Sequence, residues 1–228
     1  MRFINSVSEF DVYHEKHAMI FRDRTEAGEK LAQALNKLTL IDPIVLALPR
    51  GGIPVGRAVA QALKCTLDVI SLMKIPIPWS PEADYGVVAM DGTIALNALL
   101  IDRLELSDRE LEVATFVVLQ EAQRRERLYR RGKPFPRLEN RTVILIDDGL
   151  ASGYSMVAAL NVVKKRQPHI IIVAAPVASD VAFRMLSADR EIASIVTLVN
   201  DSEPFFSLSS YYRDFGSITD DDVLRDLA

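Results

Sequence analysis

Apolar residues along this chain form two kinds of pattern, continuous aliphatic runs and runs in which they recur every three or four positions. The continuous runs are typical of strands buried on both faces of a sheet, and they predict strands at residues 44–48, 67–73, 143–146, 170–175 and 195–199. The helical spacing predicts helices at residues 23–38, 53–63, 107–129, 156–166 and 181–186, with a short last helix after Thr219. Because strand and helix alternate through most of the chain, we expect an α/β fold with a doubly wound, mainly parallel sheet.

One segment interrupts this alternation. Residues 75–81 hold three prolines, which remove backbone donors and restrict their neighbours, so we expect an irregular, mobile loop there. Residues 87–90 and 93–96 then flank Asp91-Gly92, a dipeptide that favours a two-residue hairpin turn between antiparallel strands.

Composition narrows the class of protein. The chain has 228 residues, of which 49% are hydrophobic, and this suits one domain with one sizeable core. Its formal net charge of −4 gives no electrostatic support for a nucleic-acid partner. The single cysteine, Cys65, has apolar neighbours that predict a buried thiol, in keeping with a reducing cytoplasm. The N-terminus lacks the apolar region of a signal peptide, and the longest apolar run, residues 170–178, is too short to span a membrane, so we expect a cytoplasmic protein.

Candidate chemistry is concentrated where the strand at residues 143–146 ends. Asp147 and Asp148 follow directly, then a turn of small residues, and a helix begins near Met156. The first turn of a helix leaves backbone N–H groups without intrahelical partners and carries partial positive charge, so it favours an anion such as phosphate. The two aspartates would repel a phosphate, which points to sugar hydroxyls, or to the water ligands of a bound Mg²⁺, as their partners.

The composition of this turn supports a phosphate site. Small residues leave space for the anion, and two serines, Ser152 and Ser155, add hydroxyl donors. A second turn of similar character, Pro49-Arg50-Gly51-Gly52, joins the strand at residues 44–48 to the next helix. Paired glycines there free the backbone to aim N–H groups at an anion, and the Arg50 guanidinium can add a charge-assisted contact.

The motif Asp-Asp-x-x-x-Ser-Gly-x-Ser after a buried strand resembles the phosphoribosyl diphosphate (PRPP) motif of type I phosphoribosyltransferases. In that family the acidic pair contacts the ribose hydroxyls and the turn holds the 5-phosphate, while a Gly-rich turn earlier in the chain holds the diphosphate. The order of the two turns is the same here. Ser152 stands where threonine is usual, and Tyr154 stands where a small residue is common.

The resemblance implies specific roles for residues of this chain. It implies a PRPP-binding set formed by Pro49, Arg50, Gly51, Gly52, Asp147, Asp148, Gly149, Ala151, Ser152, Gly153, Tyr154 and Ser155. It implies catalytic roles for Arg50, Lys74, Asp147 and Asp148, with Mg²⁺ bound at Asp147 and Asp148 through water. Related enzymes often carry a second positive charge before the lysine, where this chain has Met73.

The resemblance also divides the chain into a core at about residues 23–200 and a lid at about residues 74–97 that closes over bound PRPP. Trp79 and Glu82 are candidate lid contacts. The N-terminal arm, with Phe3, Phe10, Tyr13 and Phe21, could pack over the core, and this arm and the C-terminal tail are candidate parts of a hood over the site. His14 and His17 lack the spacing of a helical zinc pair, so we expect both on the surface.

Three functions remain open on the sequence. The first is Mg²⁺-dependent transfer of the phosphoribosyl group from PRPP to a nitrogen acceptor, in an enzyme that works as a monomer or a homodimer. Some purine-salvage relatives carry an aspartate as base at the position of Ala151, so a 6-oxopurine acceptor is disfavoured here. The second is a PRPP-binding sensor without turnover. The third is a nucleic-acid partner for the arginine cluster at residues 124–131, although a solvated helix C-terminus explains that cluster more simply.

Overall fold

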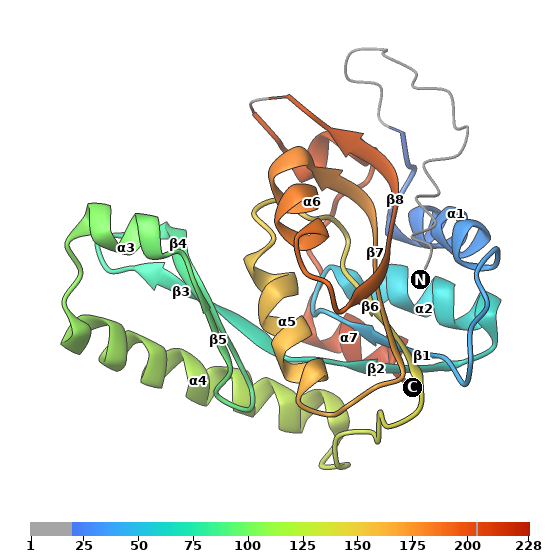
Figure 1. Ribbon diagram of the computed structural model, residues 1–228, viewed down its shortest axis with the longest axis horizontal. Coiled ribbons are helices and arrows are strands. Elements are labelled where there is room, and N and C mark those ends of the chain that lie inside the picture. The colour runs from blue at the N-terminus through green and yellow to red at the C-terminus, as the bar shows by residue number, and fades with distance from the viewer. Residues whose placement is uncertain (1–19, 204) are drawn as a thin grey trace.

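The computed structural model describes residues 20–203 and 205–228. Its centre is a five-stranded parallel sheet with the strand order β2-β1-β6-β7-β8 (Figure 1). The strands of this sheet are β1 (Ile44–Ala47), β2 (Thr66–Val69), β6 (Thr142–Ile146), β7 (Ile170–Ser179) and β8 (Ile192–Asp201). The predicted α/β class with a mainly parallel sheet is therefore confirmed. Of the predicted aromatic arm, Phe21 is buried in the core, with its ring centroid 5.5 Å from that of Tyr212. The other members of the arm and the two histidines at residues 14 and 17 lie outside the described residues.

Helices cover both faces of this sheet because successive strand residues point to opposite sides. The helices are α1 (Arg24–Leu35), α2 (Gly52–Leu63), α3 (Ala98–Leu104), α4 (Asp108–Arg130), α5 (Tyr154–Lys164), α6 (Asp180–Ser187) and α7 (Asp220–Asp226), with a 3₁₀ turn at Leu208–Tyr211. Val45 and Ile144 pack in the core under α1 and α2, whereas Leu46 and Leu145 pack in the core under α5 and α6. Strands β1 and β6 are buried on both faces, so their sequences do not alternate between apolar and polar residues.

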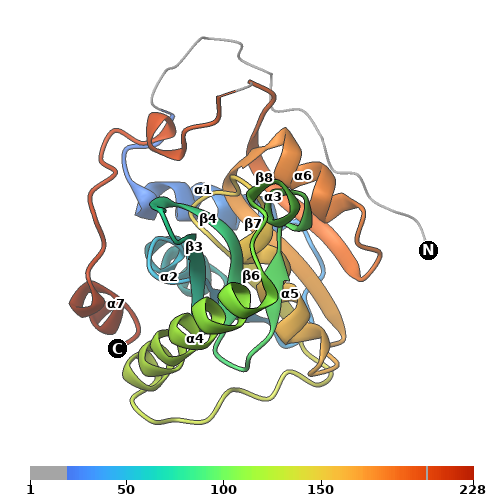
Figure 2. The same cartoon turned by 90° about the vertical axis from the view of Figure 1, so that its left-hand side faces the viewer.

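A second sheet extends from the core as an arm. It is antiparallel, has the order β3-β4-β5, and consists of β3 (Leu72–Ile77), β4 (Ser80–Ala89) and β5 (Ile94–Leu96). Helices α3 and α4 pack against it, and this arm faces the viewer in Figure 2. The capping box that Ser107 and Glu110 predict at the start of α4 is present, with both of its hydrogen bonds.

Three predictions for this region are wrong in detail. Residues 67–73 form the ends of two strands, since the chain leaves the parallel sheet after Val69 and enters the arm at Leu72. Residues 75–81 are mostly in strands β3 and β4, because register shifts around Pro76 let the antiparallel ladder accommodate a residue without an N–H donor. The hairpin after β4 has three loop residues, because Ala89 N–H donates to Thr93 O and Gly92 adopts φ +82°.

The arginine cluster contains a buried member that the sequence did not reveal. Arg130 is 7% exposed, donates to the Asp68 carboxylate at 3.0 Å and to Val69 O at 2.9 Å, and pairs with Glu126. A fully solvated helix end is therefore wrong for this residue, which ties the last turn of α4 to the parallel sheet. The Cys65 thiol is half-buried, and burial raises its pKa above the ordinary value.

Candidate active site

The two Gly-containing turns meet at the point where the strand order reverses. Strand β1 connects through α2 to β2 on one side, and its neighbour β6 connects through α5 to β7 on the other. In doubly wound sheets, ligands bind in the crevice that opens at the carboxyl ends of two such strands. Leu48 N–H donates to Ile146 O at 2.8 Å, so the ends of β1 and β6 are held together directly below the turns.

The glycines of the first turn are required by this close approach. A Cβ at Gly51 would lie 2.1 Å from the Asp148 Oδ2 atom, and a Cβ at Gly52 would lie 2.8 Å from Ile146 O and 3.0 Å from the Asp147 Cα. Any side chain at either position would therefore push the turns apart. The predicted juxtaposition of residues 49–52 with the acidic pair is present in the structure.

Backbone N–H groups at the start of α5 are available to a ligand. Among the described residues, no hydrogen-bond acceptor is found for the N–H groups of residues 151–156, nor for the hydroxyls of Ser152 and Ser155. Gly153, at φ +84°, makes the turn that aims them. The N–H groups of Arg50 and Gly51 likewise have no acceptor in the described chain. Two sets of free donors thus follow the carboxyl ends of the neighbouring strands β1 and β6.

A cavity of about 190 Å³ lies over the α5 turn. It is lined by Lys74, Asp147, Asp148, the turn residues Gly149 to Gly153, Ser155, Met156 and Leu208. Lys74 comes from the arm and pairs with Asp84 at 3.0 Å, while Leu208 comes from the C-terminal segment. The cavity therefore draws on three parts of the chain that are far apart in sequence.

The two aspartates have different surroundings. Desolvation raises the pKa of Asp147 well above its ordinary value, and the negative charge of Asp148 raises it further, whereas nearby Lys74 lowers it. The Asp147 Oδ1 atom accepts the Asp148 N–H at 2.9 Å. Asp148 is 8% exposed, and its Oδ2 atom accepts Arg24 Nε–H at 2.7 Å. Among the described residues, Asp147 forms no ion pair, whereas Asp148 pairs with Arg24.

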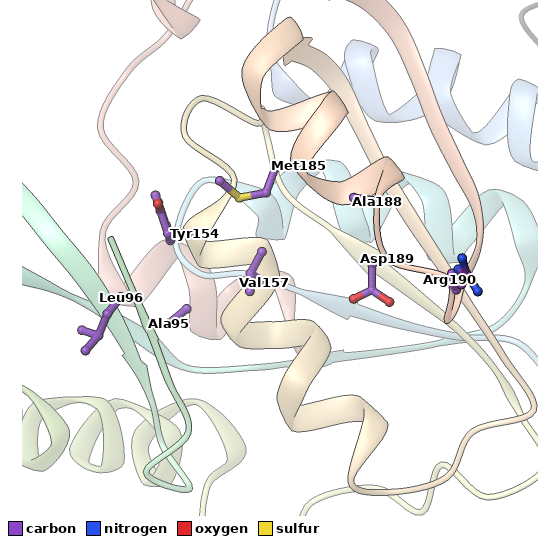
Figure 3. Close-up of a pocket in the computed structure, with 8 residues that line it drawn as sticks. All are labelled: Ala95, Leu96, Tyr154, Val157, Met185, Ala188, Asp189 and Arg190. Carbon is purple, nitrogen blue, oxygen red and sulfur yellow. The ribbon is translucent and has the colours of Figure 1, made fainter. Parts of the chain in front are cut away.

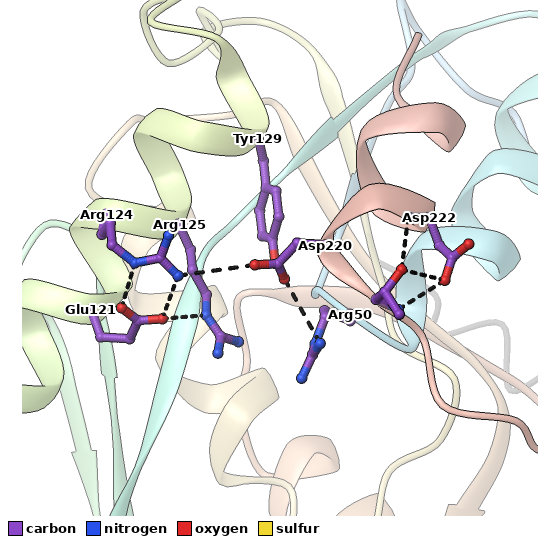
Figure 4. A network of polar contacts seen from close by, with 8 residues as sticks. Arg50, Glu121, Arg124, Arg125, Tyr129, Asp220 and Asp222 are labelled. Atoms are coloured by element: carbon purple, nitrogen blue, oxygen red, sulfur yellow. Dashed lines mark hydrogen bonds and ion pairs between the residues drawn. The ribbon is translucent and has the colours of Figure 1, made fainter.

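Arg50 points toward the C-terminal helix instead of lining the cavity. Its guanidinium lies 3.8 Å from the Asp220 carboxylate, which also accepts the Tyr129 hydroxyl at 2.6 Å (Figure 4). Arg124 approaches the same carboxylate at 3.9 Å, and both Arg124 and Arg125 bind Glu121. Burial, followed by the hydrogen bond to Asp220, raises the pKa of Tyr129. The first turn thus places its glycines against the acidic pair and its arginine in a neighbouring polar network.

Tyr154 also points away from the cavity of the acidic pair. Its side chain lines a second, open hollow of about 520 Å³ between β5, α5 and the end of α6 (Figure 3). The walls of this hollow are largely apolar, with Leu96, Val157 and Met185, and its rim carries Asp189 and Arg190. The Tyr154 backbone, and not its ring, belongs to the turn at the start of α5.

The predicted lid contacts are not at the site in this structure. Trp79 is 61% exposed and lies in the short connection between β3 and β4, and Glu82 is exposed as well. The hairpin end of the arm is fastened to the C-terminal end of α5, where Lys165 donates to Thr93 at 2.5 Å and Arg166 pairs with Asp91 at 3.4 Å. Closure of the lid stays a prediction.

Comparisons with known proteins identify the family of this chain. The family model of the phosphoribosyl transferase domain matches residues 91–203, a range that includes β6, the acidic pair and α5. The crystal structure of TT1426 from Thermus thermophilus is 40% identical in sequence, covers 92% of this chain and 98% of its own, and superposes with a TM-score of 0.74. Rv0571c of Mycobacterium tuberculosis, a provisionally named phosphoribosyl transferase, is 32% identical over 90% of this chain. The chain belongs to the phosphoribosyltransferase family. It spans less than half of the length of Rv0571c, 46%.

The chain offers few side-chain ligands of its own to a metal ion. No cluster of three or more His, Cys, Asp or Glu side chains suited to a metal is found in the described part of the chain. Mg²⁺ commonly keeps several waters and binds through one or two carboxylates together with substrate phosphates. The donor set here, Asp147 beside the partly engaged Asp148, fits an ion that arrives with a diphosphate, and does not fit an all-protein cage.

The sequence did not indicate several residues that lie at or beside this candidate site. Arg24 follows the N-cap residue of α1, and that position suggests only a solvated helix start. Asp220 belongs to a run of three aspartates that reads simply as the acidic first turn of a short helix. Leu208 lies in an irregular segment. No local pattern marks these residues, because their contacts depend on where the C-terminal segment returns to the core.

Proposed function

We propose that this phosphoribosyltransferase transfers the 5-phosphoribosyl group of PRPP to a nitrogen acceptor, a nucleobase or related compound, with release of diphosphate and with Mg²⁺ as cofactor. The observation that carries the proposal is the set of unpaired N–H groups at residues 151–156, at the edge of a cavity that also holds the Asp147 carboxylate. Donors suited to a phosphate and an acceptor suited to sugar hydroxyls thus line one cavity, where β6 ends and α5 begins.

In the proposed reaction the protein mainly binds and orients. The α5 turn holds the 5-phosphate, Asp147 accepts hydrogen bonds from the ribose hydroxyls, and the free N–H groups of Arg50 and Gly51 receive the diphosphate. The acceptor nitrogen forms a bond to the anomeric carbon while the bond from that carbon to the diphosphate oxygen breaks. The electron pair leaves with diphosphate, and the acceptor nitrogen gives up its proton. When bound, Mg²⁺ supplies charge neutralisation for the diphosphate.

Lys74 and the acidic pair set the charge balance at this site. Lys74 Nζ is held by Asp84, and its side chain is 68% exposed, so it can turn toward an incoming diphosphate at little cost. Asp147 supplies negative charge near the anomeric carbon, where positive charge develops as the leaving group departs. Mg²⁺ would be held by Asp147 and Asp148 through water, as the resemblance implies.

The test is an assay of diphosphate release. The protein is incubated with PRPP, Mg²⁺ and a panel of purine and pyrimidine bases, with Asp147→Asn as the matched inactive control. We expect release that depends on one class of base and is lost in the variant. Base-independent release, or equal release by the variant, would contradict the proposal.

A PRPP sensor without turnover is the second candidate, and specific contacts favour it. Asp148 is held by Arg24 and Arg50 by Asp220, and the position before Lys74 is the uncharged Met73. A sensor would bind PRPP tightly in a calorimetric titration and release no diphosphate with any base in the panel.

The surroundings in which the protein works are also proposals. A role in nucleotide metabolism in the cytoplasm follows from the proposed reaction and from a single, half-buried cysteine. Among the described residues, no helix has both the length and the apolar character needed to cross a membrane. Sedimentation velocity would distinguish a monomer from a homodimer.

A further inference from the structure

Both ends of the described chain converge on Asp148. Arg24, the first residue of α1, donates through Nε to Asp148 Oδ2 at 2.7 Å and through Nη1 to Gly216 O at 2.9 Å. Arg24 and Asp148 are each 8% exposed. The Phe215 ring lies under the Arg24 guanidinium, 3.9 Å from its Cζ atom. The cation is thus fixed on one side by a ring, on another by a carbonyl oxygen, and in front by the carboxylate.

The segment that carries Phe215 and Gly216 is itself fastened to the site. The Tyr212 hydroxyl donates to Asp148 O at 2.6 Å, and its ring is buried. Phe21 N–H donates to Tyr211 O at 2.9 Å, and Arg213 N–H donates to Phe21 O at 2.9 Å. Residues 211–216 therefore lie along the start of α1 as a strap that contacts both the backbone and the partner of Asp148.

The contacts of Arg24 affect both the charge and the orientation of the Asp148 carboxylate. A carboxylate this deeply buried is costly unless it is paired, and a charge-assisted bond to arginine is among the strongest pairings available. Pairing also leaves the site with one uncompensated carboxylate, Asp147, where two would repel an anionic ligand more strongly. The paired carboxylate is packed against the first turn, since a Cβ at Gly51 would fall 2.1 Å from its Oδ2 atom. The turn therefore bounds the Asp148 carboxylate on one side, and Arg24 holds it on another.

We propose that Arg24, held by Phe215 and Gly216, is a positioning residue that fixes the orientation of Asp148 and neutralises its charge so that the acidic pair can bind the sugar of PRPP. Through this contact the C-terminal strap, residues 211–216, is part of the architecture of the site. The proposal rests on the proposed function, and it assigns no contact between Arg24 and the ligand.

The test compares Arg24→Gln, Arg24→Lys and Phe215→Leu with the wild type by calorimetric titration of PRPP with Mg²⁺, of ribose 5-phosphate and of inorganic phosphate. Arg22→Gln is the matched control, because Arg22 is an exposed arginine two residues away that pairs with Asp23. For Arg24→Gln we expect affinity for PRPP and ribose 5-phosphate to fall on the order of tenfold to a hundredfold, the range of a lost charge-assisted bond. Arg24→Lys keeps the charge and should recover part of the loss. Affinity for inorganic phosphate should stay within about twofold of the wild type, because the phosphate turn is not touched.

Stoichiometry separates positioning from loss of fold. A partly unfolded variant lowers the number of sites per chain and leaves the dissociation constant unchanged, whereas a mispositioned carboxylate raises the dissociation constant at full stoichiometry. If Arg24→Gln binds ribose 5-phosphate as the wild type does, or loses inorganic phosphate to the same degree, the positioning role is wrong. If the wild type itself binds neither PRPP nor ribose 5-phosphate, the proposed function is wrong instead.

Discussion

Replacing Gly52 by alanine tests the close approach of the two turns. The added methyl would sit 2.8 Å from Ile146 O and 3.0 Å from the Asp147 Cα, both of them backbone atoms that a side-chain rotation cannot move. The backbone must therefore shift by several tenths of an ångström. Overpacking of this kind costs about 1–3 kcal/mol, against which alanine recovers at most about 1 kcal/mol of helix propensity.

The matched control for this change is Gly149→Ala. Its methyl would meet Leu208 Cδ1 at 2.1 Å, which is the far end of a flexible side chain that can rotate away. Both substitutions reduce the entropy of the unfolded chain by the same amount, so that contribution cancels in the comparison. Urea unfolding should show Gly52→Ala less stable than Gly149→Ala by about 1–2 kcal/mol. Equal stability of the two variants would refute the packing of the first turn on β6.

Two further predictions concern buried charge. Arg130→Ala leaves the Asp68 and Glu126 carboxylates without their cation, so it should lower the free energy of unfolding, measured by urea titration, by about 3 kcal/mol. The control is Arg127→Ala, at an exposed position on the same helix, whose free energy of unfolding should stay within about 0.5 kcal/mol of the wild type. The raised pKa of Asp147 means that the folded state holds the carboxyl proton more tightly than the unfolded state does. The resulting stabilisation is complete below the ordinary pKa of 3.8 and is lost as pH rises, so Asp147→Asn should gain stability relative to the wild type between pH 4 and pH 8. A parallel pH dependence of stability in the two proteins would contradict this prediction.

The sequence predicted the framework of the fold because its elements carry strong local signals. The aliphatic runs at β1, β6 and β7 fit strands that are buried on both sides, and the capping residues Asp23 and Ser107 begin α1 and α4 where expected. The predicted turns also lie together, because parallel strands bring their carboxyl ends to one edge. What failed was the segment around Pro76, where tertiary pairing overrode the local preference against strand.

The side-chain partners of the site could not be predicted in the same way. The motif indicates where Arg50 and Asp148 lie in the chain, but their orientation depends on Asp220 and Arg24, which are 170 and 124 residues away from them in sequence. Nothing in the local pattern of either segment specifies such a long-range pairing. Arg130 illustrates the same limit, because an arginine-rich helix end looks solvated until Asp68 and Val69 are placed beside it.

A crystal structure with ribose 5-phosphate bound would test the central claim most directly. The account predicts phosphate oxygens within hydrogen-bond distance, about 2.7–3.2 Å, of N–H groups from residues 151–155, with the sugar hydroxyls directed at the Asp147 carboxylate. A phosphate bound elsewhere, or a sugar that makes no contact with the acidic pair, would contradict it.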